Sequence, residues 1–245
     1  MGRRDSVFRY IVIALFAILI CCGIFMLAMP RIAGRPRKPQ TDGVQAGEAD
    51  VPENMRDSDA ESTGIASNMD YASVKLLCGD YKGCGVVWEF DAESITILTT
   101  AHLLVYGETA TVYWADGSSN TAIVTHLADQ IDVAFAKVAR VDVSEQVLAN
   151  IEGARSYPEE QIAYGTEAQL VAAGDRGERT HLAGTVIARR FVPEMNNVML
   201  ILEMTISPGM SGSPVYDSNG YLLGIAVAGN TEETLVVPAD MIGAE

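Results

Sequence analysis

Hydrophobic and polar positions divide the chain into three parts with different patterns. Residues 11–29 are apolar throughout and contain no charged side chain. Residues 30–70 are rich in Pro, Gly, Asp, Glu and Ser and poor in large apolar residues. From residue 71 onward, short runs of β-branched, aliphatic and aromatic residues alternate with turn signals, which is typical of β-strands.

The apolar segment is long enough to cross a bilayer. It has 19 residues, and a transmembrane helix needs about 20. A cleaved signal peptide is the alternative, but its apolar region is usually shorter and ends in a small-residue cleavage site. The sequence favours an uncleaved anchor at residues 11–29, after a short basic tail of residues 1–10. Basic residues flank the segment on both sides, so the positive-inside rule does not decide its orientation.

Residues 30–70 are expected to form a disordered linker, because they cannot bury enough apolar surface to offset their chain entropy. The folded part, residues 71–245, contains about a dozen strand-like runs and little helical periodicity, with VSEQVLANI as the best helical candidate. Many short strands predict an all-β fold of closed or sandwiched antiparallel sheets. Strand density falls between residues 141 and 164, so we expect an N-terminal barrel at 71–140 and a C-terminal barrel at 165–245.

Charge and cysteines limit the function classes. The formal net charge of -15 argues against non-specific nucleic-acid binding, which needs a basic surface. Cys78 and Cys84 flank a turn in CGDYKGC, where two strands could bring them within disulfide range. Two buried free thiols are the alternative. No suitably spaced partners accompany these cysteines, so we expect no metal site.

Three short motifs supply the parts of a nucleophilic site. His102 follows a strand in ILTTAHLL, Asp132 begins the apolar run in DQIDVAFAKV, and Ser211 lies in SPGMSGSP. Nucleophilic hydrolysis by serine needs a base to take its proton and a carboxylate to orient that base. Each motif alone could be structural, but their joint presence on an all-β chain favours catalysis.

Other residues of the same types fit less well. Ser213 lacks a glycine two residues before it, where an amide donor is needed. Asp129 has no apolar run directly after it, and neither His126 nor His181 follows a pair of small residues. His102, Asp132 and Ser211 therefore remain the preferred trio.

The motifs resemble those of trypsin-like (chymotrypsin-fold) serine proteases, and are most similar to the HtrA/Deg-type branch. The matching segments are GCGVVWEFDAESITILTTAHLL, DVAFAKV and GMSGSPVYDSNGYLLGIAV. The resemblance implies two antiparallel six-stranded barrels with the site between them. It also implies that Ser211 is the nucleophile, His102 the general base and Asp132 its orienting group. The backbone amides of Gly209 and Ser211 would form the oxyanion hole.

The same resemblance implies a substrate pocket lined by Thr205, Val227, Ala228 and Gly229. Because Thr205 is not acidic, we expect a small or medium uncharged side chain before the cleaved bond. The sequence shows no new N-terminus of the IVGG type, and we expect no PDZ-like module after LVVPADMI.

The sequence predicts a single-pass membrane protein whose serine endopeptidase domain lies outside the cytoplasm. Its partners would be a protein or peptide substrate and the membrane, through residues 11–29. The chemistry requires no cofactor, and the oligomeric state stays open. A catalytically inactive trypsin-like domain that binds peptides or proteins is the alternative, and a structural membrane-anchored β-domain would leave the motifs unexplained.

Overall fold

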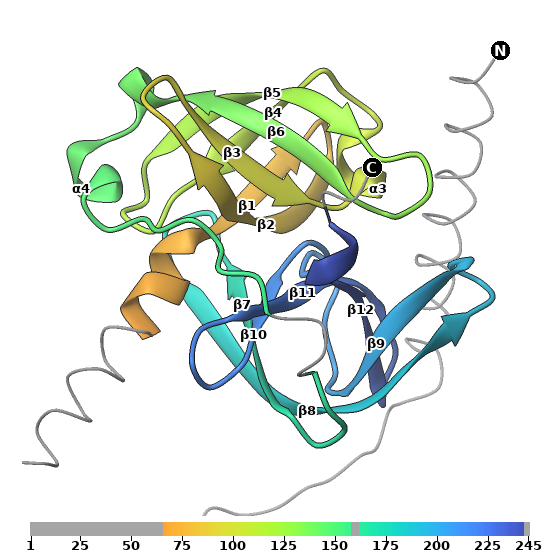
Figure 1. The fold of residues 1–245 in the computed structure, drawn as a ribbon. Helices are drawn as coiled ribbons and strands as arrows, with labels where there is room; N and C mark the ends of the chain where they lie inside the picture. The colour runs from red at the N-terminus through yellow and green to blue at the C-terminus, as the bar shows by residue number, and fades with distance from the viewer. Residues whose placement is uncertain (1–65, 158–161, 243–245) are drawn as a thin grey trace, which may run out of the picture.

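The computed structural model describes residues 66–157 and 162–242. These residues form two β-barrels, which lie one above the other in Figure 1. The expected membrane anchor at residues 11–29 falls outside the described residues. Among the residues that are described, no helix is both long and apolar enough to span a bilayer.

A helix of residues 66–72 leads into the first barrel. The prediction of a disordered linker is therefore wrong for residues 66–70, whereas residues 30–65 are outside the described part. Met69 and Ala72 are buried in an apolar cluster, and the Ser73 hydroxyl donates to the Met69 carbonyl at 2.7 Å. Burial of these two side chains stabilises the helix, in a segment whose composition predicted a tether.

The first barrel, which we call the N-barrel, closes in the strand order β1-β2-β3-β6-β5-β4. All of its strand pairs are antiparallel. A short helix, α3 (Ala101–Leu104), follows the third strand. The strands of the N-barrel are β1 (Ser73–Cys78), β2 (Tyr81–Phe90), β3 (Ser94–Thr99), β4 (Thr109–Tyr113), β5 (Ser119–Leu127) and β6 (Ala134–Ala139).

The second barrel, the C-barrel, closes in the equivalent order β10-β11-β12-β9-β8-β7 and is also antiparallel. The predicted pair of six-stranded antiparallel barrels is thus confirmed. The strands of the C-barrel are β7 (Glu167–Ala173), β8 (Arg179–Val192), β9 (Asn197–Glu203), β10 (Pro214–Tyr216), β11 (Leu222–Gly229) and β12 (Glu233–Pro238).

Short helices accompany the barrels. The 3-10 helix η1 (Arg140–Asp142) and α4 (Glu145–Leu148) lie in the connection between them, and η3 (Ala239–Met241) follows β12. The segment VSEQVLANI is helical only over α4, where the Ser144 hydroxyl caps the helix by accepting from the Val147 amide at 3.2 Å.

The two barrels share an apolar interface. Ile95 and Ile97 of β3 point into the N-barrel core, whereas Leu98 belongs to a cluster that also contains Ile225 and Val227 of β11. The two faces of β3 are therefore both buried, which explains why SITILT lacks a simple alternation of polar and apolar residues. Each fully buried Ile or Leu side chain contributes about 1.5–3 kcal/mol, so this interface holds the barrels together.

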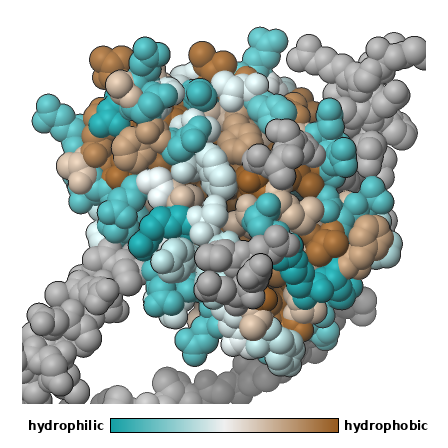
Figure 2. Space-filling model, in the orientation of Figure 1, coloured by the Kyte–Doolittle hydropathy of each residue, from teal (hydrophilic) through white to brown (hydrophobic). Residues whose placement is uncertain are grey.

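Apolar side chains also reach the surface. On the face seen in Figure 2 they are interspersed with hydrophilic residues. Tyr81 and Tyr106 are among the exposed aromatic residues, and their rings stack with centroids 4.1 Å apart.

Candidate active site

His102 is held on a short helix directly after a buried strand. Its neighbours Ala101 and Leu104 are fully buried, which attaches α3 to the N-barrel. The His102 backbone N–H donates to Asp132 Oδ1 at 2.9 Å, and its ring Nδ1 lies 2.6 Å from Asp132 Oδ2. Both oxygens of one carboxylate therefore orient the same histidine, one through the main chain and one through the ring.

The environment of this pair suits a base near neutral pH. The Asp132 side chain is 2% exposed and the His102 side chain 15%. Burial lowers the pKa of the His102 imidazole, but the charge of Asp132 and the hydrogen bond to it raise the pKa, which lies above its usual value of 6.5. A carboxylate at Nδ1 keeps the ring proton there and leaves Nε2 as the proton acceptor.

Ser211 lies in a tight double turn between β9 and β10. The Met210 amide donates to the Ser207 carbonyl at 3.1 Å, and the Gly212 amide donates to the Ala226 carbonyl at 2.7 Å. Gly209 and Gly212 have φ values of 88° and 86°. Glycine adopts this region without steric cost, so the sequence PGMSG can form the turn that presents Ser211.

The Ser211 turn meets the N-barrel at strand β2. The Cys84 amide donates to the Ser211 carbonyl at 2.7 Å. A Cβ at Gly83 would lie 2.7 Å from a Leu103 side-chain carbon and 2.9 Å from the Ser211 carbonyl oxygen. Leu103 is the neighbour of His102 on α3, so Gly83 has the histidine helix on one side and the serine turn on the other. The structure thereby brings the three predicted motifs to one junction between the barrels.

A sequence model described as "Trypsin-like peptidase domain" matches residues 83–225. This range covers more than half of the chain and includes His102, Asp132 and Ser211. The chain belongs to this trypsin-like peptidase family.

Solved structures support the same fold for this trypsin-like peptidase domain. A crystal structure of Deg5 is similar with a TM-score of 0.59 and 17% identity, covering 78% of this chain and 94% of that one. A crystal structure of the Rv3671c protease in an inactive form is similar with a TM-score of 0.57 and 18% identity, covering 73% and 88%. A search of curated protein sequences finds no match.

The competing histidines of the trypsin-like peptidase domain have other partners. His126 lies on β5, where its ring is 6.2 Å from that of Phe135. His181 lies on β8, with Nε2 2.8 Å from an Asp70 oxygen and Nδ1 2.8 Å from the Gln169 amide nitrogen. Of the chain's three histidines, all within the described ranges, His102 alone is hydrogen-bonded to Asp132.

The predicted pocket residues differ in how far they are exposed. Thr205 is exposed, and its hydroxyl donates to the Thr231 carbonyl at 3.0 Å in a groove that Glu203 and Glu232 also line. The Val227 side chain is buried in the apolar cluster shared by the barrels, so only its backbone can face a substrate. Ala228 and Gly229 are half-buried at the end of β11. A Cβ at Gly229 would lie 2.7 Å from Ile206 Cγ1, which places Ile206 directly against this glycine.

The disulfide considered between Cys78 and Cys84 is not formed, and both thiols are free. The two strands are paired as expected, but Cys78 is opposite Tyr81 and Cys84 is opposite Lys75. Cys78 points into the N-barrel core, whereas Cys84 belongs to the apolar cluster of the C-barrel. The cysteine pair therefore gives no indication of an oxidising compartment.

Lys75 is a site residue that sequence reasoning missed. It lies on β1 of the N-barrel, and its Nζ donates to the Gly209 carbonyl at 2.8 Å, across to the C-barrel. No local sequence signal marks a lone lysine in SVKLLC. The strand register that sets it opposite Cys84 becomes visible only in the fold.

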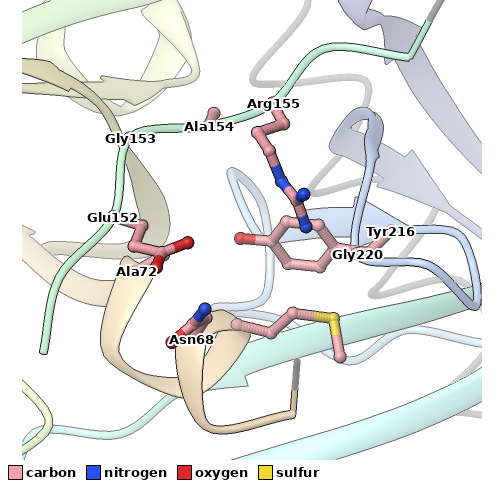
Figure 3. Close-up of a pocket in the computed structure, with 9 residues that line it drawn as sticks. Asn68, Ala72, Glu152, Gly153, Ala154, Arg155, Tyr216 and Gly220 are labelled. Carbon is pink, nitrogen blue, oxygen red and sulfur yellow. The ribbon is translucent and has the colours of Figure 1, made fainter. Parts of the chain in front are cut away.

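A small pocket lies apart from these residues, between the helix of residues 66–72, the connection at residues 152–155 and the β10–β11 hairpin (Figure 3). The Tyr216 hydroxyl points into it, toward the side where Glu152 lies. Burial raises the pKa of this tyrosine, so it stays neutral. Within the described ranges, no group of three or more His, Cys, Asp or Glu side chains could hold a metal ion.

Proposed function

We propose that this chain is a membrane-tethered serine endopeptidase that uses Ser211, His102 and Asp132. The observation that carries the proposal is the double hydrogen bond from His102 to Asp132, beside a serine turn that is bound to the same barrel through Cys84. Membership of the trypsin-like peptidase family supports peptide-bond hydrolysis independently.

In the proposed reaction, the Ser211 hydroxyl attacks the carbonyl carbon of the scissile bond. Its proton passes to Nε2 of His102, and Asp132 stabilises the imidazolium that forms. The C–N bond then breaks, the leaving amine takes the proton from His102, and an acyl-enzyme on Ser211 remains. Water, deprotonated by His102, releases the acid and restores the serine.

Two backbone amides would stabilise the oxyanion of the tetrahedral intermediate, those of Gly209 and Ser211. Donors that are held in place before the reaction stabilise developing charge without reorganisation, and each contributes about 10²–10³ in rate. The positive φ of Gly209 and the bonded turn around it support this role.

The side chain before the cleaved bond would be small or medium and uncharged. Ile206 packs against Gly229 and limits the space beside it, and Thr205 itself is uncharged, although Glu203 and Glu232 line the same groove. A cleavage profile of a peptide library dominated by Arg or Lys would contradict this preference.

Labelling with a fluorophosphonate probe tests the nucleophile. We expect the wild-type protein to be labelled and Ser211→Ala to lose labelling, because the phosphonyl group bonds to the activated serine oxygen. Ser218→Ala, which changes an exposed serine in the β10–β11 turn, should label like the wild type. Equal labelling of Ser211→Ala would exclude Ser211 as the nucleophile, and no labelling of the wild type would favour a binding module.

The tether and the side of the membrane are tested separately. Residues 11–29 would anchor the protein with its peptidase domain outside the cytoplasm, as the apolar run and the polar segment after it suggest. An Asp59→Cys variant should react with a membrane-impermeant maleimide in intact cells. Cys78 and Cys84 should add little to this labelling, because both are buried. Protection of this cysteine until the cells are permeabilised would reverse the orientation.

A further inference from the structure

A single lysine connects the N-barrel to the turn that carries Ser211. Lys75 is half-buried on β1, and its Nζ donates to the Gly209 carbonyl oxygen at 2.8 Å. The two residues belong to different barrels and are 134 positions apart in the sequence. A half-buried cation with a short bond to a backbone carbonyl of the serine turn calls for a functional explanation.

The carbonyl that Lys75 holds belongs to the peptide group between Gly209 and Met210. The N–H of the same peptide group, on Met210, donates to the Ser207 carbonyl at 3.1 Å. Both ends of this peptide plane are therefore bonded, one to the opposite barrel and one within the turn. Its orientation is set more strongly than a turn hydrogen bond alone would achieve.

This peptide plane lies between the two amides proposed as oxyanion donors. The Gly209 N–H precedes it and is related to it by the dihedral angles of Gly209, whereas the Ser211 N–H follows it through those of Met210. Glycine has the widest range of dihedral angles of any residue, and Gly209 has φ 88°. If the central plane rotated, at least one of the two amides would turn away from the oxyanion.

Cys84 reinforces the contact of Lys75 with the turn. It lies directly opposite Lys75 in the β1–β2 pairing. Its amide donates to the Ser211 carbonyl at 2.7 Å, and its Sγ lies 3.5 Å from the Gly209 oxygen and 4.0 Å from Lys75 Nζ. Lys75 and Cys84 thus bind the carbonyls of the two residues on either side of Met210 in the chain.

We propose that Lys75 is a positioning residue, which orients the Gly209–Met210 peptide and thereby the two oxyanion donors. The proposal rests on the proposed peptidase function of Ser211. It makes the oxyanion hole depend on the N-barrel, although both of its amides belong to the C-barrel. The positive charge of Lys75 also faces the turn where negative charge develops, in partly water-excluded surroundings where such charges act strongly.

The kinetic test uses the variants Lys75→Met and Lys75→Arg in the full chain, with Lys82→Met as the matched control. Lys82 is exposed on β2. Fluorophosphonate inactivation yields a maximal rate and a half-saturating concentration at several pH values. For Lys75→Met we expect the maximal rate to fall about 10–10²-fold, less than or equal to the loss of one donor. The half-saturating concentration and the pH midpoint set by His102 should stay unchanged, and Lys75→Arg should recover most of the rate.

Amide hydrogen exchange supplies a second readout that does not need an active enzyme. In Lys75→Met we expect the peptide containing Met210 to exchange at least about tenfold faster, because its turn opens more readily, while strands of the N-barrel exchange as before. Lys82→Met should change neither region.

The two readouts separate the possible failures. Wild-type labelling that Lys75→Met leaves unchanged would overturn the positioning role and leave the peptidase proposal intact. Unchanged exchange at Met210 would overturn it as well. A wild-type protein that does not label, but whose Met210 segment exchanges faster in Lys75→Met, would overturn the peptidase and with it the catalytic role of Lys75, leaving only a structural contact.

Discussion

The His102–Asp132 pair and the Ser211 turn are held by different kinds of contact. The pair lies within the N-barrel and is connected by two hydrogen bonds to the Asp132 carboxylate, one from the His102 main chain at 2.9 Å and one from its ring at 2.6 Å. The turn belongs to the C-barrel, yet its carbonyls at Gly209 and Ser211 are bonded to Lys75 and Cys84 of the N-barrel. The two bonds of the pair therefore lie within one barrel, whereas the bonds of the turn to Lys75 and Cys84 need both barrels folded and packed together.

The largest effect is expected from breaking the pair. Asp132→Asn removes the carboxylate that sets the tautomer of His102, and the rate of peptide hydrolysis should fall about 10⁴-fold. The turn should be unaffected, because no bond of Asp132 reaches it among the described contacts. Hydrolysis by the wild type and the variant would be compared with the same peptide substrate, and a loss of less than tenfold would contradict the role of Asp132.

The pH dependence sharpens this prediction. His102 accepts a proton only when it is neutral, so activity should rise with pH through its pKa, which Asp132 raises above 6.5. Without the charge of Asp132 that pKa falls, and the acidic limb of the kcat/KM profile should move to lower pH in Asp132→Asn. A limb that moves to higher pH would show that another group controls it.

Disturbing the turn should cost less activity than breaking the pair. Gly209→Ala places a side chain at φ 88°, where L residues are strained by about 1–2 kcal/mol. Its added Cβ would meet only Lys75 Nζ, at 3.5 Å, so the protein should fold with the turn displaced. We expect kcat to fall about 10²-fold with little change in KM. A raised KM at unchanged kcat would indicate a substrate contact instead.

The last prediction concerns stability and not activity, and compares alanine substitutions at two glycines. An added Cβ at Gly212 would overlap the Cys84 carbonyl oxygen, whereas an added Cβ at Gly79 would have no described heavy atom within 4 Å beyond its chain neighbours. Both glycines have positive φ. Urea unfolding should show a loss above about 3 kcal/mol for Gly212→Ala and about 1–2 kcal/mol for Gly79→Ala. Equal losses would mean that the backbone conformation, and not the contact between barrels, decides the cost.

Much of the fold could be predicted because strands and turns leave local signals. Runs such as SITILT and LLGIAVAG lie in β3 and β11, and the sparse segment from residue 141 to 164 separates the two barrels. The helix of residues 66–72 escaped prediction because its stability comes from burying Met69 and Ala72 against distant residues, which composition cannot reveal. The sequence left a disulfide and two buried free thiols as alternatives for Cys78 and Cys84, because it does not show that the two side chains point into different cores.

The residues of the candidate site could be predicted only in part from the sequence. His102, Asp132 and Ser211 each stand in a short motif whose residue types suit their chemistry. Lys75 and Cys84 have no such motif, because their contacts with the serine turn follow from the register of β1 and β2 and from how the barrels meet. Spacing within one strand contains no information about a loop that follows more than 100 residues later.

The division of the site between the barrels has a consequence for the protein as it is being made. The N-barrel leaves the ribosome first, so His102 and Asp132 are made before the serine turn. The proposed nucleophile, Ser211, is made later, and its carbonyl binds the Cys84 amide only once the serine turn has folded. If the proposed function holds, a chain that has made only the N-barrel has a base but no serine for that base to activate, so it cannot yet cleave neighbouring proteins.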